Sequence, residues 1–362
     1  MKHFAPLALI LLSLTSPALA GVYSPAEPCP FEVVGGVAKP LPHAKFKSLL
    51  NDRRTELNPA IPEFDEIETA TGKQQMPTAR GKAMARVREL SAKVDRLTPA
   101  ERLALSADLV RTGTLGKEFA ALKRVTGERP RDYRLAANYA HTETLTGNWS
   151  VAARGFEDHV LELDPPADLP GHSPEQLKWV LAVDKKQYHR WLRVRLADAG
   201  KKRSTDDEPY PLFAGVTFVG AELSPADKAK LPADAVAVVQ QLALWSPTDT
   251  GLLWLLAEVY AATGLLREAD DALDMCTWSA GMTGPKRLME HRKTVKAAVE
   301  KLPPVADDIL PTPPAPPEED GGLFALVPRE RLFLFGGVFV AFAVALLALQ
   351  VRAWRRRGRS VG

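Results

Sequence analysis

The amino-acid sequence predicts an all-α fold, and three observations lead to this prediction. Apolar residues recur at three- and four-residue steps over 77–97, which is the spacing of one buried helix face. Thr98, Ser173 and Ser224 are each followed by proline, a pattern typical of helix starts. No long segment alternates with the period of two that a half-buried strand requires, apart from an ambiguous stretch over 212–219. A body of helices with short connections is therefore expected.

Two consecutive segments of equal length form the first part of this body. Gly113 and Gly147 lie 34 residues apart, each near the turn of an expected helix pair. A proline-containing break ends each pair, so the two units span 99–132 and 133–166. Two further units are expected within 216–283, and the first helix of the earlier one is degenerate.

One of these later units carries the clearest family pattern. Its Ala257, Tyr260, Gly264, Ala269 and Leu273 fall at spacings that resemble the tetratricopeptide repeat (TPR). The resemblance implies a solenoid of antiparallel helix pairs, because each pair buries its apolar face only by stacking on the next.

The resemblance has departures that leave a second interpretation open. Ala136 and Arg102 stand where the family has a bulky residue early in the first helix, and Glu118 replaces a usual alanine. An unrelated helical bundle with coincidental spacing is the alternative. The TPR-like helical domain is placed at 77–302, with a non-repeat insertion at about 167–215.

The resemblance also implies a site for a partner. In the family, the first helices of the repeats line a concave face that holds a peptide or a partner helix. The matching positions in this chain are Arg134, Asn138 and His141 in one unit, and Trp254 and Glu258 in another. Burial of Trp254 in the core is the alternative interpretation of that residue.

The insertion combines basic and aromatic residues and has two interpretations. It forms either a cationic surface for acidic peptides, anionic glycans or lipid headgroups, or an apolar helix face whose bases are solvated. Acidic residues within the insertion offset much of the charge, which favours the second interpretation. The residues concerned are Lys178, Lys185, Lys186, Arg190, Arg193, Arg195, Lys201, Lys202 and Arg203 with Trp179, Tyr188 and Trp191.

The amino-terminal region predicts export. Lys2 precedes an apolar run, and Ala18-Leu19-Ala20 has the small-residue pattern of a cleavage site, so residues 1–20 are expected to be a signal peptide. Prolines interrupt 21–76, which is expected to be an irregular arm with at most a short helix near 45–54.

The carboxyl-terminal region predicts a single-pass membrane anchor. Residues 303–330 are rich in proline and acidic residues, as in an extended stalk. The segment 331–351 is long and apolar enough for one transmembrane helix, and the arginines of 352–362 indicate a cytoplasmic tail. A sorting signal that is cut during export is the alternative. The domain between the signal peptide and the stalk is expected to be periplasmic or extracellular.

The chemistry expected of the exported part is limited. Cys29 and Cys276 either pair as a disulfide or remain an unpaired loop cysteine and a buried helix cysteine. The net charge of +3 does not indicate nucleic acid binding. No metal-binding, cofactor-binding or catalytic motif was found, so neither a metal nor a cofactor is expected.

Three functions are compatible with these sequence features. The favoured hypothesis is a membrane-anchored extracytoplasmic scaffold that binds a protein or peptide partner and is not an enzyme. A cell-envelope enzyme with a site formed by the insertion and the arm is the first alternative, because long interruptions are often functional. A structural subunit of an envelope complex is the second.

Overall fold

The computed structural model describes residues 23–24, 28–69, 72–198, 208–279, 282 and 285–303. The predicted signal peptide, membrane span and basic tail, and all of the predicted stalk after Pro303, lie outside these residues. Among the described residues, no helix combines the length and the apolar character needed to cross a bilayer. The chain up to Leu302 forms one compact unit.

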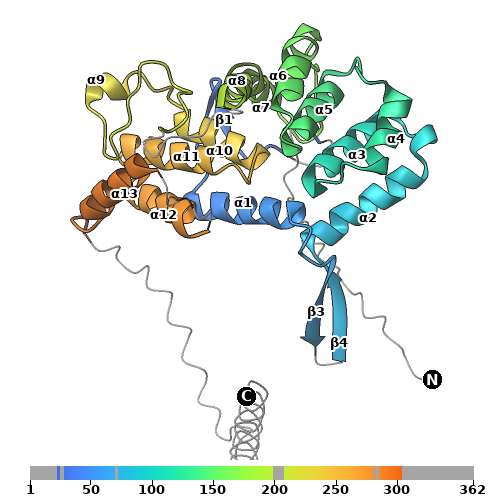
Figure 1. Cartoon of the computed structure of the whole chain (residues 1–362), viewed down its shortest axis with the longest axis horizontal. Helices are drawn as coiled ribbons and strands as arrows, with labels where there is room; N and C mark the ends of the chain where they lie inside the picture. Colours follow the sequence, from blue (N-terminus) through green and yellow to red (C-terminus); the bar gives the residue numbers. More distant parts are fainter. Residues whose placement is uncertain are drawn as a thin grey trace, which may run out of the picture. The chain divides into compact units, whose positions relative to one another are not determined.

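The prediction of a mostly helical chain is confirmed (Figure 1). Short 3-10 or π-helical turns extend several of the helices. The longer helices are α1 (His43–Leu57), α2 (Ala79–Ala92), α3 (Pro99–Thr112), α4 (Lys117–Thr126), α5 (Tyr133–Leu145), α6 (Trp149–Glu157), α7 (Pro174–Ala182), α8 (His189–Asp198), α10 (Ala235–Trp245), α11 (Thr250–Thr263), α12 (Leu266–Asp274) and α13 (Lys286–Val299). The shorter elements are α9 (Pro225–Lys228), η1 (Val94–Arg96), η2 (Val160–Glu162), η3 (Val183–Tyr188) and η4 (Met275–Ser279).

Local sequence signals fix several of these helix ends. Thr98 and Glu101 form a capping box at the start of α3, and Ser173 and Gln176 form another at α7. These side chains satisfy backbone N–H groups that have no partner within the helix. Gly113 ends α3 in the left-handed conformation, with a φ of 63°, which glycine adopts without steric cost.

The helices expected in the first two units are present. The pairs α3/α4 and α5/α6 occupy 99–132 and 133–166, and within each pair the helices pack against one another. In the later region, α11 packs on α12 as expected. The stretch 212–219 contains no strand, and the degenerate first helix of that unit is reduced to the single turn α9.

The prediction of an irregular arm over 21–76 is wrong apart from the short helix expected near 45–54, which is present and longer than expected. This stretch contains α1 and two small antiparallel hairpins: β1 (Val33–Val34) with β2 (Val37–Ala38), and β3 (Phe64–Thr69) with β4 (Gly72–Pro77). Its prolines border these elements instead of interrupting them, since Pro42 directly precedes α1. The second hairpin projects from the helices beside α2 (Figure 1).

The first part of this stretch is buried in the core. Tyr23, Phe31 and Phe46 are each at most 1% exposed and belong to the same hydrophobic cluster as α10 and α11. Segments that the sequence separates therefore share one core.

Two side-chain amides hold the backbone of this segment at its ends. Asn138 of α5 accepts a hydrogen bond from the Tyr23 N–H (3.0 Å) and donates one to the Tyr23 carbonyl (2.9 Å). Gln240 of α10 makes the same pair of contacts with Leu41, at 2.8 and 3.0 Å. Each amide replaces the two hydrogen bonds that a neighbouring strand would supply.

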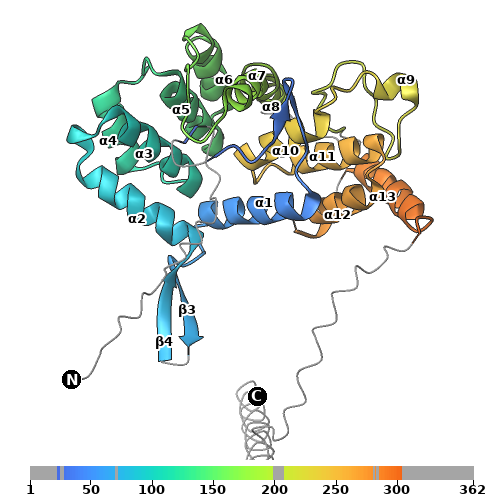
Figure 2. The same cartoon turned by 180° about the vertical axis from the view of Figure 1, so that it is seen from behind.

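Between these two amides the segment lies against α7. The Phe31 ring packs on the Trp179 ring at 5.1 Å, and Gln176 donates to the Phe31 carbonyl at 2.7 Å. In Figure 2 the dark blue segment that carries β1 lies beside α7, which contacts both β1 and β2. The described residues 23–24 and 28–41 thus connect helices from the two predicted repeat regions and from the insertion, and we call them the internal segment.

A buried charge network then fixes α1 on α3. The Glu56 carboxylate accepts from Arg53 (2.7 Å) and from Arg111, to which it is also bound by a second short contact. On the same face of α3, Asp108 accepts two hydrogen bonds from Arg86 of α2 at 2.7 and 2.9 Å. Glu56, Arg53, Arg111 and Asp108 are all buried, so each charge depends on its partners for solvation.

We expect Asn138→Ala to lower the free energy of unfolding by about 2–4 kcal/mol, because it leaves the buried N–H and carbonyl of Tyr23 without partners. Denaturant titration measures this change. Asn51→Ala, at an exposed position within α1, is the matched control and should not lower stability. Equal effects of the two variants would contradict the role of Asn138.

We expect Glu56→Gln to lower stability at pH 7 by about 3 kcal/mol, because Arg53 and Arg111 lose a buried counter-charge. Burial opposes the ionisation of Glu56, but the two arginines outweigh it and hold its pKa below 4.5. The folded pKa is depressed, so this stabilisation is present above pH 4.5 and disappears as the pH falls through the folded pKa.

Denaturation midpoints of the wild type and Glu56→Gln between pH 3 and pH 7 test this expectation. The two curves should converge at the acidic end. The exposed Glu89→Gln serves as the control and should follow the wild type throughout. A difference that stays constant with pH would contradict the expected ionisation of Glu56.

Candidate functional site

The five residues predicted to line a peptide-binding groove lie in or beside the core. Asn138, His141 and Trp254 are fully buried, and Glu258 is only 2% exposed. Arg134 is partly exposed, but the Asp132 carboxylate binds it at 2.7 Å. The structure therefore does not present the four buried side chains to an external partner.

Each buried residue already has an internal partner. His141 contacts the Trp245 carbonyl at 2.6 Å through Nε2, and Trp254 donates to Glu258 at 2.7 Å. Asn138 binds the backbone of Tyr23 of the same chain, where the resemblance implied an external partner. The alternative interpretation of Trp254 as a core residue is the one that the structure bears out.

A buried carboxyl group lies close to the Asn138 contact. Asp184, in the π-helical turn η3, accepts hydrogen bonds from the hydroxyls of Tyr23 (2.8 Å) and Tyr133 (2.9 Å) on the same oxygen, Oδ2. Its other oxygen has no hydrogen-bond partner among the described residues. Burial raises the pKa of Asp184 to about 7, although both tyrosines and Lys185 favour the charged form. Because Asp184 is sealed from solvent, we interpret it as a structural group.

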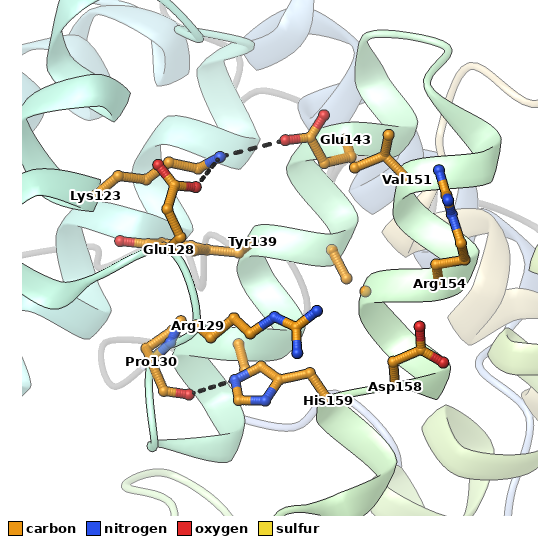
Figure 3. A pocket seen from close by; sticks show the side chains of 13 residues that line it. Lys123, Glu128, Arg129, Pro130, Tyr139, Glu143, Val151, Arg154, Asp158 and His159 are labelled. Carbon is orange, nitrogen blue, oxygen red and sulfur yellow. Dashed lines mark hydrogen bonds and ion pairs between the residues drawn. The ribbon is translucent and has the colours of Figure 1, made fainter.

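An open cavity lies on the surface formed by α4, α5 and α6, and Figure 3 shows it. Its volume is about 340 Å³. The lining includes an apolar floor and six charged side chains. These residues are Lys123, Glu128, Arg129, Pro130, Ala136, Tyr139, Ala140, Glu143, Val151, Arg154, Gly155, Asp158 and His159.

Part of the charge in this cavity is already paired. Lys123 forms ion pairs with Glu128 (3.2 Å) and Glu143 (3.5 Å), which close one end of the cavity. The His159 ring contacts the Pro130 carbonyl at 2.8 Å and fixes the loop between α4 and α5.

The remaining charges are exposed. Arg129 and Asp158 have no ion pair with any described residue, and in Figure 3 the Arg129 guanidinium points into the cavity. Arg154, on the opposite wall, donates one hydrogen bond, from Nε to the Ser150 carbonyl at 3.2 Å. The cavity thus offers two guanidinium groups and one carboxylate to a ligand.

One residue that forms this cavity was noted in the sequence, although the sequence did not predict a cavity there. Ala136 occupies a position where the TPR pattern has a bulky residue, and it forms part of the cavity floor together with Ala140. A large side chain at 136 would fill this space. The departure from the family pattern at Ala136 therefore coincides with a cavity, whereas four of the five positions that were predicted from the family to bind a partner are buried.

The two cysteines are free and buried. Cys29 lies beside the loop before α7, where its N–H donates to the Gly171 carbonyl, and Cys276 lies in η4 near the Thr250 carbonyl. The disulfide considered from the sequence is therefore absent. Burial raises the pKa of Cys29 to about 11 and that of Cys276 to about 12, so both thiols are protonated at neutral pH.

Among the described residues, no group of three or more His, Cys, Asp or Glu side chains is arranged to hold a metal ion. Comparison with known proteins found no matching family model, no matching curated protein and no matching solved structure.

We expect the contribution of Asp184 to the stability of the wild type to fall as the pH rises from about 4 to about 7. The folded pKa of Asp184 lies above its ordinary value of 3.8, so the protonated form is stabilised and this contribution is lost as the pH passes 7. A difference of three pKa units corresponds to about 4 kcal/mol.

Denaturation of Asp184→Asn at pH 5 and pH 8 measures this contribution. The stability advantage of the wild type over Asp184→Asn should decline between the two values. This difference removes the effect of other groups such as His141, whose burial lowers its pKa to about 4 and acts in the opposite direction. Asp65→Asn, at an exposed position on β3, should differ from the wild type by the same amount at both values. A difference between the wild type and Asp184→Asn that does not change with pH would contradict the raised pKa.

Proposed function

We propose that this protein is a membrane-anchored extracytoplasmic scaffold that binds a segment of a partner protein in the cavity between α4, α5 and α6. The observation that carries the proposal is the set of unpaired charges around an apolar floor. Arg129, Arg154 and Asp158 surround small apolar side chains in an open cavity of about 340 Å³. The proposed membrane location rests on the sequence of the two ends of the chain.

The charges define the chemistry of the segment. Two guanidinium groups favour a carboxylate, either an acidic side chain or a chain terminus, because arginine pairs well with planar anions. Asp158 favours a lysine, an arginine or an amino terminus on the same ligand. A polypeptide supplies both kinds of charge together with an apolar side chain for the floor.

In this proposal the partner does not contact the buried residues that the sequence predicted to line a TPR-like groove. The internal segment provides an extended backbone to Asn138 and Gln240, so external partners meet other surfaces. The described part of the insertion supplies Trp179, Tyr188 and Trp191 to the core. Their burial favours a packing role for these aromatic residues over the enzyme site considered for this region.

Site-specific photo-crosslinking in intact envelopes tests the proposal. A photoreactive amino acid at Val151, which is 46% exposed and lines the cavity, should form an adduct with a partner protein. The same probe at Met289, 39% exposed on α13, should not form that adduct. Arg129→Glu combined with Arg154→Glu should reduce the adduct at Val151 at least tenfold, because both guanidinium groups are reversed.

The crosslinking result would contradict the proposal in two ways. Identical adducts from Val151 and Met289 would show contact without a defined site. An adduct at Val151 that survives the double arginine substitution would show that these charges do not bind the partner. Circular dichroism of each variant establishes that the helices are intact before the comparison is made.

A further inference from the structure

A second hollow surface lies along α7 and the π-helical turn η3, away from the residues of the first cavity. It consists of two cavities of about 360 and 570 Å³, and both are lined by Lys185 and Lys186. Because they share these two residues, the two cavities are adjacent, and we call them together the lysine groove. No residue of the lysine groove lines the cavity of Figure 3.

The two halves of the lysine groove differ in polarity. The smaller half has apolar walls from the loop before α7 and from α7 itself, including Pro165, Pro166, Leu177 and Leu181. Lys178 lines this apolar half as well. The larger half is lined by the long polar side chains Lys185, Lys186, Gln187, His189, Arg190 and Arg193.

The lysines of the groove have no ion-pair partner among the described residues. Lys178 and Lys186 are exposed, and the Lys185 ammonium lies 5.3 Å from the centre of the Tyr133 ring. Within the larger half, the Glu157 carboxylate binds His189 at 2.6 Å and Arg193 at 3.1 Å. That carboxylate is therefore already occupied, and no carboxylate of the described residues lies within ion-pair distance of the three lysines.

The π-helical turn explains why two adjacent lysines line the groove. Val183, Asp184 and Tyr188 of η3 are buried, while Lys185 is partly exposed and Lys186 is exposed. A π-helical turn widens the helix locally, and such turns occur frequently at functional sites. The buried contacts of Asp184 with Tyr23 and Tyr133 hold this turn in place.

We propose that the lysine groove binds an acidic segment of a partner protein that carries an apolar residue between its carboxylates. The carboxylates pair with Lys178, Lys185 and Lys186, and the apolar side chain enters the hollow between Pro165 and Leu181. This proposal is independent of the cavity of Figure 3 and holds whether or not that cavity binds a partner.

An anionic membrane surface fits these observations less well than an acidic polypeptide. Proteins that bind membrane interfaces insert exposed apolar side chains next to their basic residues. None of the large exposed apolar side chains of the described residues lies between 165 and 193. The apolar part of the groove is a hollow that receives a side chain.

Fluorescence anisotropy with the full-length protein in detergent micelles tests this inference. The probe is a labelled peptide of sequence Asp-Glu-Leu-Asp-Glu-Leu-Asp-Glu. We expect saturable binding that weakens as the salt concentration rises, since ion pairs are screened. A peptide with serine in place of both leucines should bind at least threefold more weakly.

Charge-reversal variants locate the binding. Lys178→Glu combined with Lys186→Glu should weaken peptide binding at least tenfold. The matched control is Lys45→Glu combined with Lys82→Glu, two exposed lysines on α1 and α2, which should change affinity by less than about twofold. Arg129→Glu combined with Arg154→Glu should leave peptide binding unchanged, which separates this test from that of the first cavity.

Three results would overturn the inference. The first is the absence of saturable peptide binding at low salt. The second is an equal loss of affinity in the lysine-groove variant and in either of the other two double variants. The third is binding to vesicles that contain an anionic phospholipid, lost in the lysine-groove variant, when the peptide itself does not bind.

Discussion

The hydrogen bonds from Asn138 and Gln240 to the backbone of the internal segment are the contacts on which the rest of the structure depends. They join residues that lie 115 and 199 positions apart in the chain. Without them, the segment would bury backbone N–H and carbonyl groups that have no other partner at either end. With them, the described residues of this segment contact α5, α7 and α10, and their apolar side chains join the same hydrophobic cluster as α10 and α11.

This arrangement determines where partners can bind. Side chains that a helical-repeat protein offers to an external peptide are here directed at the protein's own backbone and core. Two hollow surfaces of the described residues are open to other molecules, namely the cavity between α4, α5 and α6 and the lysine groove along α7 and η3. Asp184 links the internal segment to the lysine groove. It accepts a hydrogen bond from Tyr23, and the π-helical turn to which it belongs also carries Lys185 and Lys186.

Features governed by local chemistry were predictable from the sequence. The capping residues Thr98 and Ser173 correctly marked the starts of α3 and α7, and Gly113 marked the end of α3, because caps and left-handed turns depend on a few adjacent residues. The extent of α1 was underestimated, since its stability comes from buried contacts such as that of Glu56 with Arg111.

Features governed by distant contacts were not predictable in this way. In β3 the apolar Phe64 and Ile67 lie three residues apart and both are exposed, so this strand lacks the alternation that normally reveals one. Asn138 was predicted to contact a partner, and nothing in its neighbourhood in the sequence shows that the backbone it binds is that of Tyr23 in the same chain. The cavity of Figure 3 likewise depends on the packing of three helices around Ala136.

Native-state hydrogen exchange of the Tyr23 and Leu41 amides tests the role of the internal segment most directly. If Asn138 and Gln240 hold this segment as part of the core, both amides should exchange only through global unfolding, with the same opening free energy as amides in the middle of α11. Exchange of either amide at the rate of the exposed hairpin β3–β4 would contradict this, since the segment would then open while the helices remain folded.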